Sequence, residues 1–174
     1  MEHVEISKLD REPHPMGVNT ERRDVGTALG TEDVGAVHYE LDPGEQFSGG
    51  LHTHHDQDEV FYVLEGMATF EHHDPEADRT ELGGDPRDHT ETTYVEAGEV
   101  VRFEPGEFQC GRNESDDTVV GLAIAAPGRR HEGTDLESFA PCSDCGEVTT
   151  HGVREPDEAF VIYCNECGAE MQVA

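Results

Sequence analysis

Short segments of alternating apolar and polar residues constrain the fold of this 174-residue chain most strongly. Such alternation is typical of strands that bury one face, and Gly- and Pro-containing turns separate the segments. No amphipathic helical pattern of similar strength interrupts the series. It therefore predicts an all-β protein, built as a small antiparallel sandwich or barrel. The predicted strands cover residues 37–41, 51–54, 59–64, 67–70, 93–95, 100–103, 108–111 and 118–125.

Changes in composition divide the chain into four segments. Residues 1–33 are polar and interrupted by Pro and Gly, which predicts an arm with one short strand near Ile6. Residues 34–126 contain the strand pattern and would form the barrel, with residues 71–92 as a long exposed loop. Residues 127–141 are predicted to form a linker, and residues 142–174 are predicted to form a separate cysteine-bearing unit.

The charge of the chain excludes polyanionic partners. Its 40 acidic and 11 basic residues give a formal net charge of −29, and Lys8 is the sole lysine. Nucleic acids and anionic membranes would be repelled by such a surface. This composition resembles that of halophilic proteins, in which salt at about 1 M shortens the Debye length to about 3 Å and screens the repulsion. We therefore expect an acidic, halophilic protein.

Targeting signals are not visible in the sequence. The first ten residues have no apolar core of the kind found in secretory signals, and no apolar run reaches the roughly eighteen residues of a membrane span. Most of the cysteines occur in C-x-x-C pairs, which fit metal binding in a reducing compartment better than disulfides. We expect a cytoplasmic protein.

One stretch carries a candidate metal site. His52 and His54 are two residues apart, so on a strand both side chains point to the same face. A short turn would allow Glu59 to begin the next strand alongside them. Two imidazoles and one carboxylate that converge in this way are typical of non-haem iron sites with open coordination positions. These three residues therefore predict a divalent-metal site.

The spacing of these residues resembles the first sequence motif of the cupin superfamily. The pattern His-x-His-x4-Glu-x6-Gly is matched at His52, His54, Glu59 and Gly66, although Gln46 replaces the glycine that usually precedes the first histidine. The resemblance extends over about residues 35–126 and implies a small cupin (jelly-roll) β-barrel with a metal inside, such as Fe, Mn, Ni or Zn. It also implies a small-molecule ligand and is compatible with a homodimer.

The second cupin motif is matched less completely. Its glycine and asparagine positions are present at Gly98, Gly106 and Asn113, but Gln109 occupies the histidine position. An amide oxygen is a neutral ligand that cannot tune a metal as imidazole does. Three cases stay open: Gln109 is a fourth ligand, Gln109 contacts a ligand or substrate beside a three-residue site, or the barrel has lost its metal.

The lining of the barrel pocket follows from strand alternation. Phe61 and Val63 share the parity of Glu59, so both are predicted to line a substrate pocket. His55 has the opposite parity to the two histidine ligands and should point away from them. Cys110, next to Gln109, is predicted to be a small thiol in the core.

The C-terminal unit carries a second candidate metal site. Cys142 and Cys145 form one C-x-x-C pair, Cys164 and Cys167 form another, and eighteen residues separate the two. This spacing resembles that of zinc ribbons, in which four thiolates hold a structural zinc with no open position. A unit of this size needs the metal to fold. Its seven acids against the single Arg154 disfavour nucleic acid, so contact with a protein partner is the expectation.

Three functions are compatible with these features, and the fold alone does not select among them. The first is a metal-dependent enzyme of the oxygenase or isomerase type that acts on a small molecule. The second is a non-enzymatic cupin that senses a small ligand or metal and docks a protein through its zinc ribbon. The third is a zinc-ribbon interaction protein whose barrel is a scaffold. The residues do not identify a separate general base.

Overall fold

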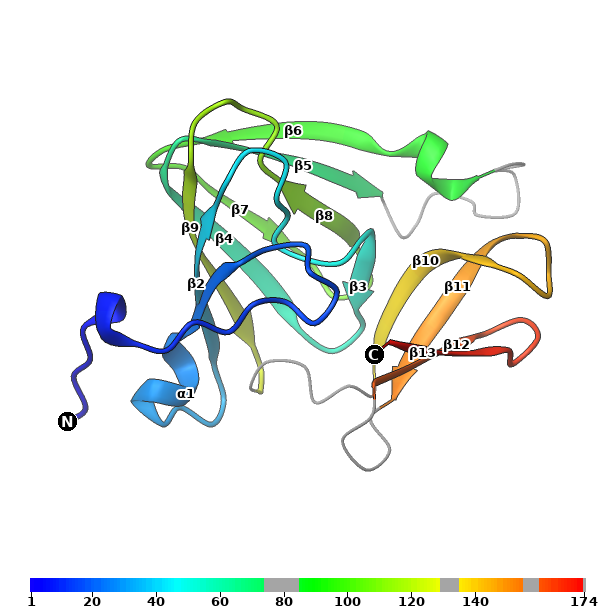
Figure 1. The fold of residues 1–174 in the computed structure, drawn as a ribbon, viewed down its shortest axis with the longest axis horizontal. Helices are drawn as coiled ribbons and strands as arrows, with labels where there is room; N and C mark the ends of the chain where they lie inside the picture. Colours follow the sequence, from blue (N-terminus) through cyan, green and yellow to red (C-terminus); the bar gives the residue numbers. More distant parts are fainter. Residues whose placement is uncertain (74–84, 129–134, 155–159, 174) are drawn as a thin grey trace.

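The computed structural model describes residues 1–73, 85–128, 135–154 and 160–173, which form two antiparallel sheets (Figure 1). The five-stranded sheet contains, in spatial order, β1 (Glu21–Asp24), β2 (Gly35–Leu41), β9 (Val119–Ala126), β4 (Asp58–Glu65) and β7 (Val100–Phe103). The eight-stranded sheet contains β13 (Glu170–Val173), β12 (Phe160–Cys164), β11 (Glu147–Arg154), β10 (Leu136–Cys142), β3 (His52–His54), β8 (Phe108–Arg112), β5 (Met67–His73) and β6 (Glu91–Glu96). The predicted all-β class is confirmed.

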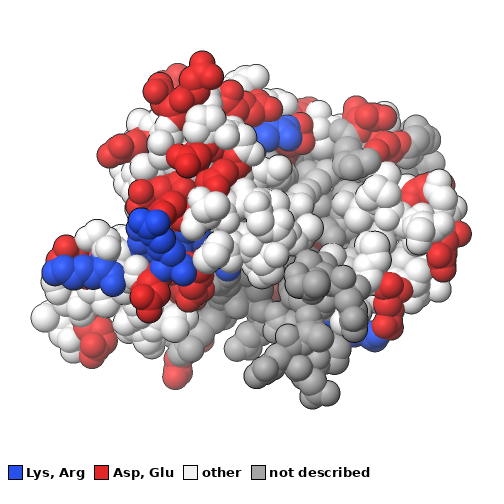
Figure 2. Space-filling model, in the orientation of Figure 1, with Lys and Arg blue, Asp and Glu red and all other residues white. Residues whose placement is uncertain are grey.

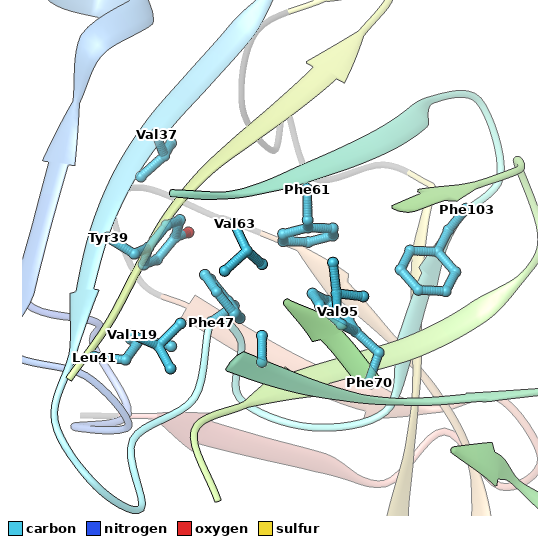
Figure 3. Close-up of a cluster of buried hydrophobic side chains, with 11 residues drawn as sticks. Val37, Tyr39, Leu41, Phe47, Phe61, Val63, Phe70, Val95, Phe103 and Val119 are labelled. Atoms are coloured by element: carbon cyan, nitrogen blue, oxygen red, sulfur yellow. The ribbon is translucent and has the colours of Figure 1, made fainter. Parts of the chain in front are cut away.

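The main hydrophobic core lies between the two sheets. Apolar side chains from β2, β4, β7 and β9 meet those from β5 and β6, and Phe47 from the loop after β2 lies among them (Figure 3). The ring of Phe47 stacks on Phe70 with centroids 5.7 Å apart and meets Tyr39 edge-on at 5.1 Å. Gly111 makes this packing possible, because a Cβ there would lie 2.4 Å from the Phe70 ring and 2.8 Å from the Phe47 ring.

The N-terminal segment differs from its prediction. Residues Ile6–Lys8 form a 3₁₀ helix, whereas the strand of this segment is β1, which pairs with β2 at the edge of the five-stranded sheet. Its sequence is polar, and the buried Arg23 forms ion pairs with Glu40 (2.7 Å) and Glu21 (3.0 Å). After β1 follows the short helix α1 (Val25–Leu29), whose first turn is capped by the side chain of Asp24.

The segments after β9 and β5 also differ from their predictions. Residues 136–141, predicted as part of a linker, belong to β10, which pairs with β3 on one side and β11 on the other. The cysteine-bearing strands therefore continue the eight-stranded sheet of the barrel (Figure 1). The predicted loop at residues 71–92 is shorter, since β5 extends to His73 and β6 begins at Glu91, and residues 74–84 lie outside the described part.

The surface agrees with the charge of the sequence. Acidic side chains are spread over the face shown in Figure 2, with only a few basic ones among them. Among the described residues, helices are too short and too polar to cross a bilayer.

Candidate metal centres and ligand cavity

His52, His54 and Glu59 come together as the sequence predicts, with one ligand atom of each within 4.8 Å of the others. His52 Nε2 lies 3.9 Å from Glu59 Oε2, and His54 Nε2 lies 3.7 Å from Glu59 Oε1. The strands are not neighbours, however: β3 belongs to the eight-stranded sheet and β4 to the five-stranded sheet. The expectation that Glu59 lies alongside the histidines on an adjacent strand is wrong, because the ligands converge across the barrel.

The surroundings of both imidazoles suit the binding of a metal. His52 Nδ1 lies 2.9 Å from the carbonyl oxygen of Gly50, and donation of its proton to that oxygen leaves the Nε2 lone pair for a metal. Burial lowers the pKa of His54, although the nearby Glu59 carboxylate opposes the shift. His54 is therefore neutral near pH 7, and a neutral imidazole is the form that binds a cation.

Gln109 belongs to the same cluster. It lies on β8 opposite His52 and is 1% exposed. Its Nε2 donates a hydrogen bond to Glu59 Oε2 at 2.7 Å and lies 3.4 Å from His52 Nε2, whereas its Oε1 is buried without a hydrogen-bond partner. A half-turn of the amide would exchange these two atoms and direct Oε1 towards the imidazole and the carboxylate. The buried, unsatisfied oxygen therefore fits a cation held by the three other residues.

A cavity of about 510 Å³ adjoins this site, and His52 and Glu59 form part of its wall. Phe61 lines it as predicted. Val63 is not among the lining residues: its side chain is completely buried in the core, near Phe61 (Figure 3).

Residues far apart in the sequence complete the cavity. The N-terminal segment contributes His14, Met16 and Arg22, and Met16 packs so closely on Gly49 that a Cβ there would lie 2.6 Å from its sulfur. The opposite part of the wall comes from β10, β11 and β12. Sequence reasoning missed these groups. The available signal was the pair of adjacent arginines, 22 and 23, in a chain with few basic residues.

The four cysteines of the C-terminal strands form a compact second cluster, here called the thiol cluster (Cys142, Cys145, Cys164 and Cys167). The Sγ atoms of Cys142 and Cys167 are 3.6 Å apart, and those of Cys145 and Cys164 are 3.9 Å apart. Four sulfur atoms about 2.3 Å from a central zinc ion would have tetrahedron edges of about 3.8 Å. The spacing of the thiols is therefore that of a four-thiolate metal site.

Two equivalent turns build this cluster. Gly146 N donates to Cys142 O and Gly168 N donates to Cys164 O, each at 2.9 Å, and both glycines have a φ of 75°, which a side chain would strain. The Thr149 hydroxyl, 3.2 Å from Cys164 Sγ, lowers the pKa of that thiol to about 6. A hydrogen bond with Cys167 raises the pKa of Cys145 instead. All four thiols are therefore expected to ionise together only when a bound cation stabilises the thiolates.

Three further predictions concern single residues. His55 is exposed and points away from the barrel site, as predicted. Its Nε2 lies 2.9 Å from Glu137 Oε2. Cys110 is buried as a core thiol, and burial raises its pKa. His73 belongs to the segment 71–92, predicted as an exposed loop, but it is buried at the end of β5.

Comparisons with known proteins agree with this architecture. A search of curated proteins finds no match. A sugar phosphate isomerase from a cupin superfamily of Silicibacter pomeroyi is 16% identical, with a TM-score of 0.56 over 98% of this chain and 92% of that chain. A cupin protein from Bacteroides fragilis is 15% identical, with a TM-score of 0.52 over 76% and 89% of the two chains. A variant of Bacillus subtilis oxalate decarboxylase is 20% identical, with a TM-score of 0.52 over 71% of this chain and 28% of that chain.

These structural similarities show the fold. The cupin domain family itself matches residues 37–125, more than half of the chain, and the match includes the motif residues His52, His54, Glu59 and Gln109. The chain belongs to the cupin family.

Proposed function

We propose that the chain is a metal-dependent enzyme that isomerises a small anionic molecule of the sugar phosphate class. The observation that carries the proposal is the placement of three metal-ligating side chains beside a cavity of about 510 Å³. Small-molecule sites in proteins range over roughly 300–1,000 Å³. The name of the S. pomeroyi neighbour, a sugar phosphate isomerase, supports the substrate class.

The residues of the barrel fit a divalent ion. His52, His54 and Glu59 would hold it, and Gln109 would add its Oε1 after rotation of the amide. This donor set suits Fe, Mn, Ni or Zn. A bound ion would supply a Lewis acid for a carbonyl or hydroxyl oxygen of the substrate.

The cavity also carries groups for the rest of an anionic substrate. Arg22 is 5% exposed and lines the cavity, and a planar guanidinium can bind a phosphate or carboxylate through two hydrogen bonds. His14 lines the cavity as well, and its Nδ1 accepts the N–H of Met16 at 3.1 Å, which places its own proton on Nε2. We assign anion binding to Arg22 and proton transfer to His14.

NMR in D₂O tests the proposal. Zn²⁺-loaded protein is incubated with aldose phosphates, and exchange of the substrate C–H protons and formation of ketose phosphates are recorded. We expect turnover that His54→Ala abolishes. Arg22→Gln should raise KM by about tenfold for phosphorylated sugars and leave that of the unphosphorylated sugars unchanged. Absence of exchange with every phosphorylated sugar, in protein shown to hold its ion, would exclude the isomerase.

One observation favours a second candidate, a cupin that binds a small ligand or metal without turnover. Gln109 replaces the histidine of the second cupin motif, and a neutral amide tunes a metal less than imidazole does. Ligand-dependent shifts of the melting temperature without any substrate exchange would identify this function.

For the thiol cluster we propose a structural zinc ion. Its sulfur spacing supports four-thiolate coordination, which leaves no open position for substrate. Thiols that must remain reduced fit a cytoplasmic location. Elemental analysis should find one zinc that Cys164→Ser removes and His54→Ala leaves in place.

A further inference from the structure

Strand β10 connects the two candidate metal sites directly. Near its beginning Leu136 lies opposite His54 and Ser138 lies opposite His52, while its last residue is Cys142 of the thiol cluster. A strand of seven residues therefore joins the strand that carries both imidazoles to the cluster of thiols. Figure 1 shows β10 beside β3, with β11 on its other side.

The position of β3 depends on β10 more than on its other neighbour. The three residues of β3 are all in register with β10, whereas its pairing with β8 consists of His52 opposite Gln109. Without β10, strand β3 would be the edge of its sheet. Short edge strands with few ladder hydrogen bonds open easily, and the histidines would open with it.

Apolar packing fixes β10 on the barrel. Phe139 N donates to Leu51 O at 3.0 Å, and the Phe139 ring lies 4.5 Å from the ring of Phe108, centroid to centroid. These residues form a second hydrophobic cluster, separate from the main core, with Val148 of β11 packed against it. The cluster therefore connects Leu51, which directly precedes β3, with strand β8 and with strands β10 and β11.

A polar chain links the same two regions on the surface. Asn165, between Cys164 and Cys167, donates from Nδ2 to Glu137 Oε1 at 3.1 Å. The other carboxylate oxygen of Glu137 lies 2.9 Å from His55 Nε2. The turn that carries two of the thiols is thus connected through one carboxylate to the residue next to His54.

We propose that the metal held by the thiol cluster positions the metal site of the barrel, with Leu136, Glu137 and Ser138 as positioning residues for His52 and His54. This rests on the proposed function in one respect, that the barrel binds a metal. Among the residues of β11–β13 whose burial is described, Val153 and Val161 are the buried apolar ones besides Cys164. A small unit of this kind is ordered by its metal. Loss of that metal loosens the end of β10 that carries Cys142, and β3 then holds its imidazoles less accurately.

Two metals of different chemistry separate the sites. Zn²⁺ prefers thiolates, whereas Mn²⁺ prefers oxygen and nitrogen ligands. The protein is loaded with one equivalent of Zn²⁺ and titrated with Mn²⁺, whose free concentration is read by electron paramagnetic resonance, and zinc is measured by elemental analysis. Cys167 is the ligand to change, because it is the exposed member of the cluster.

We expect Cys167→Ala to lose zinc and to raise the Kd for Mn²⁺ by at least about tenfold, the size of effect known for groups that orient metal ligands. Cys167→His is the matched control, since three thiolates and one imidazole also hold zinc. It should keep both zinc and the Kd of the wild type. A merely structural defect from changing residue 167 would not be rescued in this way.

A second variant leaves the thiols in place. Glu137→Ala breaks the contacts with Asn165 and His55 and should raise the Kd for Mn²⁺ a few-fold while zinc is retained. Glu147→Ala, an exposed carboxylate on β11, is its control and should change neither value. Hydrogen exchange at residues 51–55 should accelerate in Cys167→Ala and Glu137→Ala, whereas exchange in β2 and β9 should stay at the rate of the wild type.

The proposal is overturned if Cys167→Ala lacks zinc but binds Mn²⁺ with the Kd of the wild type and exchanges residues 51–55 no faster. Failure of the proposed function gives a different result, in which the wild type itself binds no Mn²⁺. Exchange at residues 51–55 with and without the metal of the thiol cluster then still decides whether that metal positions β3.

Discussion

Replacement of Gln109 by histidine tests the barrel site most directly. The amide Nε2 of Gln109 is 2.7 Å from Glu59 Oε2 and 3.4 Å from His52 Nε2, so a side chain of similar reach at this position contacts any ion that these residues hold. Imidazole is a stronger ligand than a carboxamide for Mn, Ni and Zn. We therefore expect Gln109→His to bind a divalent ion at least about tenfold more tightly, which corresponds to about 1.4 kcal/mol.

The expected shift in thermal stability follows from linkage. An ion present at about 100 times its Kd stabilises the folded state by about 2.7 kcal/mol, and a tenfold lower Kd adds about 1.4 kcal/mol. For a chain of this length each kcal/mol raises Tm by about 2–4 °C, so Gln109→His should gain about 3–6 °C over the wild type in the same ion concentration. Without the ion the two proteins should differ by less than about 3 kcal/mol, the upper net value of one hydrogen bond to a charged group.

The assay is a melting curve with and without Mn²⁺, followed by a Mn²⁺ titration. Gln46→His is the matched control, since Gln46 bridges to β8 at Arg112 and is not part of the metal cluster. Equal Mn²⁺ affinity in Gln109→His and the wild type, with binding still dependent on His54, would show that position 109 does not contact the ion. The assignment of Gln109 as a fourth ligand would then be wrong.

Three further predictions follow from the packing, the pKa of His54 and the charge. Burial lowers the pKa of His54, so in the metal-free protein the unfolded state takes up the proton first, and stability is lost as pH falls from about 6.5 towards the lower pKa of the folded state. The melting temperature of His54→Asn should fall less over this pH range than that of the wild type. An equal pH dependence in the two proteins would contradict the lowered pKa of His54. Gly111→Ala would place a Cβ 2.4 Å from Phe70 and should cost about 1–3 kcal/mol in a denaturant titration, whereas Gly50→Ala, where nothing lies within 4 Å, should cost less. The net charge of −29 predicts that Tm rises between about 0.1 and 3 M KCl, and a Tm independent of salt would exclude the halophilic interpretation.

Much of the barrel site could be read from the chain because its signals are local. The two-residue spacing of His52 and His54 fixes their common face on any strand, and the motif spacing identified Glu59. The spacing of the two C-x-x-C pairs likewise predicted a site of four thiolates, and the four cysteines form one cluster. Strand alternation also gave the parity of Phe61 and Val63, but parity does not give depth, and Val63 lies in the core.

The sequence by itself determined the strands β2–β9, the common face of the two imidazoles and the grouping of four cysteines into one site. Only the tertiary structure decided that Glu59 meets the histidines from the opposite sheet, that Arg22 faces the cavity, and that β10 lies beside β3. The physical reason is the distance along the chain over which each interaction acts. Alternation and turn chemistry act over a few residues, whereas the pairing of β10 with β3 joins segments some eighty residues apart and depends on how every strand between them packs.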